Sequence, residues 1–359
     1  MISAREALVR EYWSLLEADG VDHLVRRAVS VENQAWLVGL IRDQAERTAA
    51  IHGEKSLLAD YTHGVLGQTP PEPRDRYART ADWIETALQA LGFDLPGTVY
   101  VGEYPHQSFN AQARAMRNGT LLLVNTGLHY LIHEVALALS TSAVIAERTG
   151  DGRVRIRKPS RAARRHQTSA ATTLANELAA YILHTDSRSG GKQQVDTTAR
   201  GFLGYLLARS AETFAVAHEY GHYLAGHLNG RRPDESEWLR KSHEQEFEAD
   251  EIGMLLTLKA HELEPDIAGL SFWKQVAVGG AFLFFGLDHL LNRIRAEVDD
   301  LPPALIVADH PPSDARAAAL RRTLTELGGP GVFQLADAYF LTLVGHEDRI
   351  LASVPRLLR

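Results

Sequence analysis

The sequence predicts a mainly α-helical protein with a small β-sheet, an α+β fold. Long stretches of the chain place apolar residues at helical spacing, whereas strand-like segments are short and gathered between residues 98 and 124. Clusters of Gly and Pro separate these stretches. A chain of 359 residues that is 45% hydrophobic can bury one large core or two smaller ones.

The N-terminal part of the chain forms the first predicted unit. Residues 3–66 show helical spacing of apolar side chains. The run Gln68–Pro73 (QTPPEP) breaks any helix and marks the predicted domain boundary. We therefore expect a helical region with a proline-rich linker at residues 1–73 and a second, larger domain at residues 74–359.

The second domain is expected to begin with a helix from about Arg74 that ends at Gly92. The predicted strands are Thr98–Val101 and Leu121–Val124, with Gln107–Ala113 as a further candidate. The helices expected after them span residues 127–147, 169–184, 197–228 and 236–261.

Residues 151–165 differ from their surroundings, because they contain seven basic residues and one acidic residue. We expect a solvated loop inserted into the second domain, and a surface for an anionic partner is the alternative. A second flexible break, Ser187–Gly191, precedes the helix that carries the main motif.

That motif is His-Glu-Tyr-Gly-His at residues 218–222, an H-E-x-x-H pattern. Residues four apart share one face of a helix, so His218 and His222 can bind one ion together. Glu219 lies beside that ion and can take a proton from water. The pattern predicts a catalytic zinc centre, and two core histidines satisfied by hydrogen bonds are the structural alternative.

A catalytic zinc site needs a third protein ligand and an open position. The metzincin spacing is absent, because Gly226 and His227 follow His222 by four and five residues. We expect His227 to support the site or to lie on the surface. The remaining source is a glutamate on the next helix, with His243 and His261 as alternatives.

The next helix carries Glu-Phe-Glu-Ala-Asp at residues 246–250. Glu246 and Asp250 share a helix face, whereas Glu248 points about 200° away from Glu246. We expect Glu246 to be the third zinc ligand and Asp250 to hold a ligating histidine through its free ring N–H. Gly253, one turn further on, would let this helix approach the motif helix closely.

A third element is His310-Pro-Pro-Ser-Asp-Ala-Arg316, in which Ser313 is the predicted N-cap of a helix that runs to Gly328. The helix dipole disfavours a cation in the first turn, so we expect Arg316 to have an anionic partner. By itself, the element is a helix start with a histidine beside it.

Composition narrows the functions further. The formal charge of −7 argues against a nucleic-acid partner, and the lack of cysteine excludes disulfides and thiol chemistry. The longest apolar run, Val276–Leu287, is shorter than the ~20 residues of a transmembrane span, so we expect a buried core helix. The charged first 20 residues do not form a secretory signal. We expect a cytoplasmic protein without a transmembrane span.

Three motifs in this order, at residues 218–222, 246–250 and 310–316, resemble the HtpX and CAAX-prenyl-protease family of zinc gluzincins. Upstream, Phe109–Ala111 and Leu121–Leu128 are similar to further segments of that family. The resemblance implies a gluzincin-type zinc metallopeptidase domain with an extra N-terminal helical region.

The resemblance also assigns roles to the site residues. The implied ligands of one catalytic Zn²⁺ are His218, His222 and Glu246. Glu219 is implied as the catalytic base and acid. Asp250 and Arg316 are implied in the surrounding charge network, and His310 in that network or in support of the oxyanion.

The same family binds peptides along an edge strand, and the matching edge here is Gln107–Ala113. We therefore expect an endopeptidase that acts on a peptide or protein bound as an extended strand. A donor must meet the developing oxyanion, for which His310 is the candidate, with Tyr220 and Tyr223 as alternatives. The long interval at residues 148–217 could add a lid or a docking element.

Two other functions remain open. A non-catalytic protein that binds zinc and a partner would have no need of the base Glu219. A zinc aminopeptidase would need a group that anchors a free amine, and the sequence contains no recognisable motif of that kind.

Overall fold

The structure is a computed structural model. It describes residues 2–28, 77–142, 145–148, 154–157, 164–183, 198–229, 235–264, 272–298, 310–328 and 330–357, with a few single positions between 30 and 50 and at 270. The predicted linker at residues 68–73 and the flexible break at residues 187–191 lie outside the described residues.

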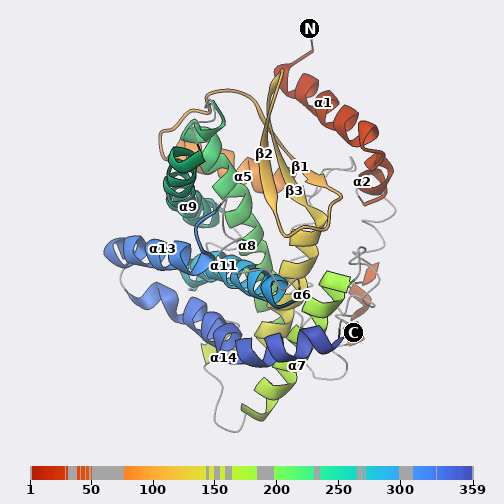
Figure 1. Ribbon diagram of the computed structural model, residues 1–359, viewed down its shortest axis with the longest axis vertical. Helices are drawn as coiled ribbons and strands as arrows, with labels where there is room; N and C mark the ends of the chain where they lie inside the picture. Colours follow the sequence, from red (N-terminus) through yellow and green to blue (C-terminus); the bar gives the residue numbers. More distant parts are fainter. Residues whose placement is uncertain are drawn as a thin grey trace.

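The described chain is mostly helical with a small sheet, which confirms the predicted α+β class (Figure 1). Its α-helices are α1 (Ala4–Ala18), α2 (Asp22–Ala28), α5 (Ala78–Ala90), α6 (Thr126–Ser142), α7 (Arg164–Leu183), α8 (Ala199–Leu224), α9 (Glu235–Leu263), α11 (Trp273–Val298), α13 (Ser313–Gly328) and α14 (Gln334–Leu357). Two short 3₁₀ helices are η2 (His227–Asn229) and η3 (Pro330–Phe333).

A three-stranded sheet consists of β1 (Val99–Tyr104), β2 (Ala111–Met116) and β3 (Gly119–Asn125), in the order β1-β3-β2. β3 is parallel to β1 and antiparallel to β2. The two predicted strands are confirmed. The third begins later than predicted, because residues 106–110 form turns with hydrogen bonds from His106 N to Tyr104 O and from Asn110 N to Ser108 O.

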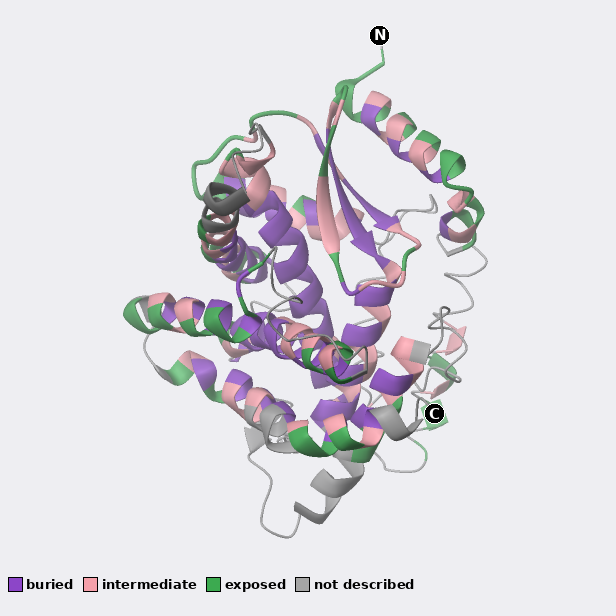
Figure 2. Ribbon diagram, in the orientation of Figure 1, coloured by how far each residue is buried: buried purple, intermediate pink, exposed green. Residues whose placement is uncertain are grey.

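The long helix α8 runs through the middle of the molecule and carries the H-E-x-x-H motif (Figure 1). Helices α6, α9 and α11 pack against it. Its side chains are buried on nearly every face, as the purple ribbon in Figure 2 shows. Polar groups on such a helix need partners inside the protein, because water cannot reach them.

The helix α1 packs on the sheet and not only on its own region of the chain. Tyr12 donates a hydrogen bond of 2.6 Å from its hydroxyl to the carbonyl oxygen of Glu103 on β1. The apolar residues in this contact include Leu8 and Leu16 from α1 and Leu121 and Leu123 from β3. At least this part of residues 1–73 therefore completes the core beneath the sheet.

Three local predictions need correction. The helix predicted at residues 127–147 ends at Ser142, and residues 145–148 form a strand instead. The motif helix ends at Leu224, before the predicted end at residue 228, because Gly226 adopts a positive φ of 74°. The basic stretch at residues 151–165 is not a loop throughout, since Val154–Arg157 form strand β5, which pairs antiparallel with β4 (Ile145–Arg148). Arg164 already begins α7.

The apolar run at residues 276–287 lies in α11 and is buried in the core, as predicted. Within the part of the chain that the structure describes, none of the helices is both long and apolar enough to cross a membrane.

Candidate metal centres

Helices α8 and α9 approach each other most closely where small residues meet. A Cβ atom on Gly253 would lie 2.9 Å from the Cα and N atoms of His218. A Cβ atom on Gly221 would lie 2.8 Å from the carbonyl oxygen of Ala249. Backbone atoms cannot be displaced easily in a close-packed core, so both positions require glycine. The predicted role of Gly253 is confirmed.

This contact brings His218 and His222 on α8 to Glu246 on α9; we call the three residues the α8–α9 cluster. Nε2 of His222 lies 3.1 Å from Nε2 of His218 and 3.2 Å from Oε1 of Glu246. Nε2 of His218 lies 3.4 Å from Oε2 of Glu246. The ligands of a tetrahedral ion with bonds of ~2.0–2.1 Å lie roughly 3.3–3.4 Å apart, so the cluster could hold a metal ion.

Asp250 and Arg316 surround this cluster with buried charge. Asp250 Oδ1 lies 3.0 Å from Nδ1 of His218, which directs the other ring nitrogen toward Glu246. Arg316 donates to Asp250 from Nε over 2.7 Å and from Nη2 over 2.6 Å. Its Nη1 lies 3.1 Å from Oε2 of Glu246. The anionic partners expected for Arg316 are therefore Asp250 and Glu246.

These contacts shift the acid–base equilibria of the cluster. Burial alone would lower the pKa of His218, but hydrogen bonds to Asp250 and Glu246 outweigh it and raise the pKa to about 9. Burial alone would raise the pKa of Glu246, but its bonds to the histidines hold that pKa well below its usual range. Burial alone would also raise the pKa of Asp250, but the charge of Arg316 outweighs burial and lowers that pKa. The two carboxylates thus favour positive charge on the side chains between them.

His222 is held by a chain of two further side chains. Its Nδ1 lies 2.9 Å from Nδ1 of His227, whose Nε2 lies 3.1 Å from Oε2 of Glu248. Glu248 itself points away from the cluster and is exposed, as predicted. His227 therefore orients His222 from outside, which is one of its two expected positions.

His310 lies at the solvent side of the cluster, just before α13. Its Nδ1 is 3.0 Å from Oε1 of Glu246, and its side chain is 63% exposed. The bond to Glu246 is the main cause that raises the pKa of His310. Ser313, the predicted N-cap, is the first residue of α13 and donates its hydroxyl hydrogen to Asp288.

Glu219 occupies the turn between the two histidines and is buried. The neighbouring tyrosines contact other elements. The hydroxyl of Tyr220 donates to Oε1 of Glu85 on α5 over 3.0 Å. Tyr223 is hydrogen-bonded to Thr120 on β3, and burial is the main cause that raises its pKa. The structure therefore gives no support to either tyrosine as an oxyanion donor.

Neither alternative ligand joins the α8–α9 cluster among the described residues. His261 follows Glu246 on α9 by fifteen residues, which corresponds to roughly 22 Å along the helix. It is buried near Arg209, and burial together with this guanidinium lowers the pKa of His261 to about 3. His243 is likewise outside both metal-ligating groups of the described chain.

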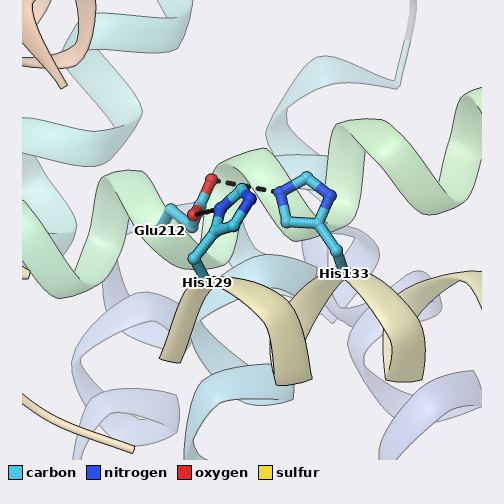
Figure 3. A group of neighbouring side chains, drawn as sticks. All are labelled: His129, His133 and Glu212. Carbon is cyan, nitrogen blue, oxygen red and sulfur yellow. Dashed lines mark hydrogen bonds and ion pairs between the residues drawn. The ribbon is translucent and has the colours of Figure 1, made fainter. Parts of the chain in front are cut away.

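A second group of metal-ligating side chains escaped the sequence analysis. His129 and His133 on α6 and Glu212 on α8 lie together and could also hold a metal ion; we call them the α6–α8 cluster (Figure 3). The available signal was H-x-x-x-H at residues 129–133, within the helix predicted at residues 127–147. Its partner Glu212 is an isolated acid in an apolar stretch of the motif helix.

The chain was compared with models of protein families, with curated proteins and with solved structures, and none of the three comparisons found a match.

Proposed function

We propose that the protein is a zinc-dependent endopeptidase of the gluzincin type. The observation that carries this proposal is the convergence of His218, His222 and Glu246 from two helices, with ligand atoms 3.1–3.4 Å apart and Glu219 in the turn between the histidines. Two imidazoles and one carboxylate are the protein ligands of many catalytic zinc sites, and they leave one position open. The order of the three motifs along the chain, at residues 218–222, 246–250 and 310–316, supports the resemblance to the HtpX and CAAX-prenyl-protease family.

Zinc held by these ligands would supply Lewis acidity, which polarises a scissile carbonyl and lowers the pKa of water toward ~7. Glu219 would accept the proton that water loses during attack and return it to the leaving amine. Asp250 would keep His218 in the tautomer that presents Nε2, through its contact with Nδ1. His310 is exposed beside Glu246, where a bound substrate can reach it and use its N–H as a donor to the oxyanion.

The substrate we infer is a peptide or protein segment in extended conformation. In the described sheet, β2 pairs with β3 on one side only and so offers an edge. β2 also lies against α8 and η2, and η2 contains His227, which bonds to His222. A peptide that adds to this edge as a further strand would pass the α8–α9 cluster. The predicted edge Gln107–Ala113 overlaps the start of β2.

The test compares the wild-type protein with Glu219→Gln, both loaded with zinc, on a mixture of N-terminally acetylated and free peptides analysed by mass spectrometry. We expect the wild type to cleave internal bonds of both kinds of peptide. Glu219→Gln should retain its zinc and lose about 10²–10⁴-fold in rate, because proton transfer by the glutamate is gone. The matched control is Glu262→Gln, an exposed glutamate near the end of α9 paired with Lys259.

Other outcomes separate the competing functions. Full activity of Glu219→Gln would contradict the proposed mechanism. Zinc bound by the wild type without turnover of any peptide would favour a non-catalytic zinc protein. Cleavage that is restricted to peptides with a free N-terminus would favour an aminopeptidase.

A further inference from the structure

The α6–α8 cluster has the arrangement of a metal site on a different face of α8 from the α8–α9 cluster. His129 and His133 are four residues apart on α6, so both imidazoles project from one face toward α8 (Figure 3). Glu212 meets them from α8, six residues before His218. Six residues correspond to about 240° of rotation and about 9 Å of rise, so the two clusters use different faces of one helix.

Both histidines of this cluster contact the carboxylate of Glu212 through atoms that could bind a metal ion. Nδ1 of His129 contacts Oε1 of Glu212, and Nε2 of His133 lies 3.3 Å from Oε2 of Glu212. The centroids of the two imidazole rings lie 4.4 Å apart. One potential ligand atom from each residue lies within 4.8 Å of those of the other two, so a single ion could contact all three residues.

The carboxylate of Glu212 is buried, and it contacts both imidazoles and the hydroxyl of Tyr77. Arg209, one turn earlier on α8, lies 2.5 Å from Glu264 and is engaged there. A buried carboxylate needs a compensating positive charge. A divalent ion would compensate the carboxylate and use both imidazoles at once.

Further contacts position Glu212 in the way that outer hydrogen bonds position metal ligands. The hydroxyl of Tyr77, which is buried at the start of α5, donates to Oε1 of Glu212 over 3.2 Å. Ordered carboxylate ligands commonly accept such a bond. The imidazoles keep some exposure, 14% for the side chain of His129 and 21% for that of His133, so an ion can enter from solvent.

We propose that His129, His133 and Glu212 form a second binding site for a divalent transition-metal ion, which ties α6 to α8. Imidazole nitrogen with one carboxylate oxygen suits Zn²⁺ and its neighbours in the first transition row, whereas Ca²⁺ and Mg²⁺ prefer oxygen ligands alone. This site is independent of the proposed peptidase function, because it shares none of its ligands with the α8–α9 cluster.

The lack of cysteine in the chain permits a direct test by ligand exchange. In His133→Cys, the only thiol of the protein would occupy a ligand position. Added Co²⁺ should then produce a thiolate-to-cobalt charge-transfer band in the near ultraviolet that saturates by two equivalents, because the α8–α9 cluster can take up one of them. The matched control is His23→Cys on the exposed face of α2, which should give no such band. A folded His133→Cys protein without the band would overturn the proposal.

Two measurements keep the test decisive if His133→Cys does not fold. His129→Cys places the thiol at the neighbouring ligand position and should give the same band. Equilibrium dialysis against Zn²⁺ should show one more tightly bound equivalent per chain for the wild type than for Glu212→Gln, and equal stoichiometry in the two proteins would overturn the proposal. Tyr77→Phe removes only the bond to Glu212 and should weaken the zinc affinity of this site about tenfold.

The tests of the α6–α8 cluster give their answer whether or not the protein is a peptidase. The cobalt band and the zinc stoichiometry do not depend on peptide hydrolysis. Loss of turnover in Glu219→Gln, in turn, does not depend on His133. Each proposal can therefore fail while the other holds.

Discussion

The two clusters on α8 have the same three residue types but different surroundings. The α8–α9 cluster has a buried arginine and aspartate behind it, a glutamate within its H-E-x-x-H turn, and the exposed His310 at its solvent side. The α6–α8 cluster has the hydroxyl of Tyr77 behind its carboxylate. On our proposals, both clusters would bind an ion, and the glutamate in the helical turn and the exposed histidine give the α8–α9 cluster the base and the substrate approach that hydrolysis also needs.

The buried charges behind the α8–α9 cluster provide the largest expected effect. Arg316→Met would leave Asp250 and Glu246 buried without their guanidinium partner. We expect the metal-free protein to lose about 3–5 kcal/mol of unfolding free energy, measured by urea denaturation in the presence of a chelator. Zinc should restore part of the loss, because it supplies positive charge at Glu246.

The control for this prediction lies on the same helix. Arg321 pairs with Asp337 over 2.6 Å, but both side chains are more than a third exposed. Arg321→Met should therefore cost less than about 1 kcal/mol. Equal losses in the two variants would show that Arg316 has no special electrostatic role.

The close contact between α8 and α9 gives the next largest effect. In Gly253→Ala the new methyl group would press on the backbone of His218, so we expect a loss of about 1–3 kcal/mol. Zinc affinity should fall at the α8–α9 cluster and stay unchanged at the α6–α8 cluster, which titration calorimetry can resolve. Gly331→Ala, where the new Cβ meets open space, should change stability by less than about 0.5 kcal/mol.

The smallest effect concerns a buried histidine outside both clusters. His261 has a folded-state pKa of about 3, below the ~6.5 of an unfolded histidine. The contribution of this histidine to stability is therefore fully present above pH 6.5. As the pH falls toward 3, only the unfolded chain takes up the proton, so the free energy of unfolding decreases. At pH 5.5 the loss is about 1 kcal/mol.

Urea denaturation between pH 7 and 5.5, in the presence of a metal chelator, tests this effect. His261→Leu should show a shallower decline of stability with falling pH than the wild type. His23→Leu, at an exposed position on α2, should follow the wild-type curve. An unchanged decline in His261→Leu would mean that this histidine accepts a proton inside the folded protein.

Local spacing in the sequence predicts the α8–α9 cluster well. The separation of His218 and His222 determines that they share a helix face, and the separation of Glu246 from Asp250 does the same on α9. Helical periodicity likewise predicts most of the described helices, and the short strand-like segments predict β1 and β3. Such features depend on residues that are close in the chain, so a single sequence contains them.

Contacts between segments that are far apart in the chain are harder to predict from a single sequence. Glu212 lies 79 residues after His133, and only the packing of α6 on α8 brings them together. The directions of Tyr220 and Tyr223, toward α5 and β3, depend on elements more than 90 residues away. Likewise, the positive φ at Gly226 ends α8 earlier than the pattern of apolar residues predicts.

The most direct test of the account is anomalous X-ray diffraction at the zinc absorption edge from crystals of the zinc-loaded protein. We predict one anomalous peak bounded by His218, His222 and Glu246, and a second bounded by His129, His133 and Glu212. The absence of a peak at the first position would contradict the proposed zinc centre. A first peak without the second would confine metal binding to the α8–α9 cluster and contradict the second site.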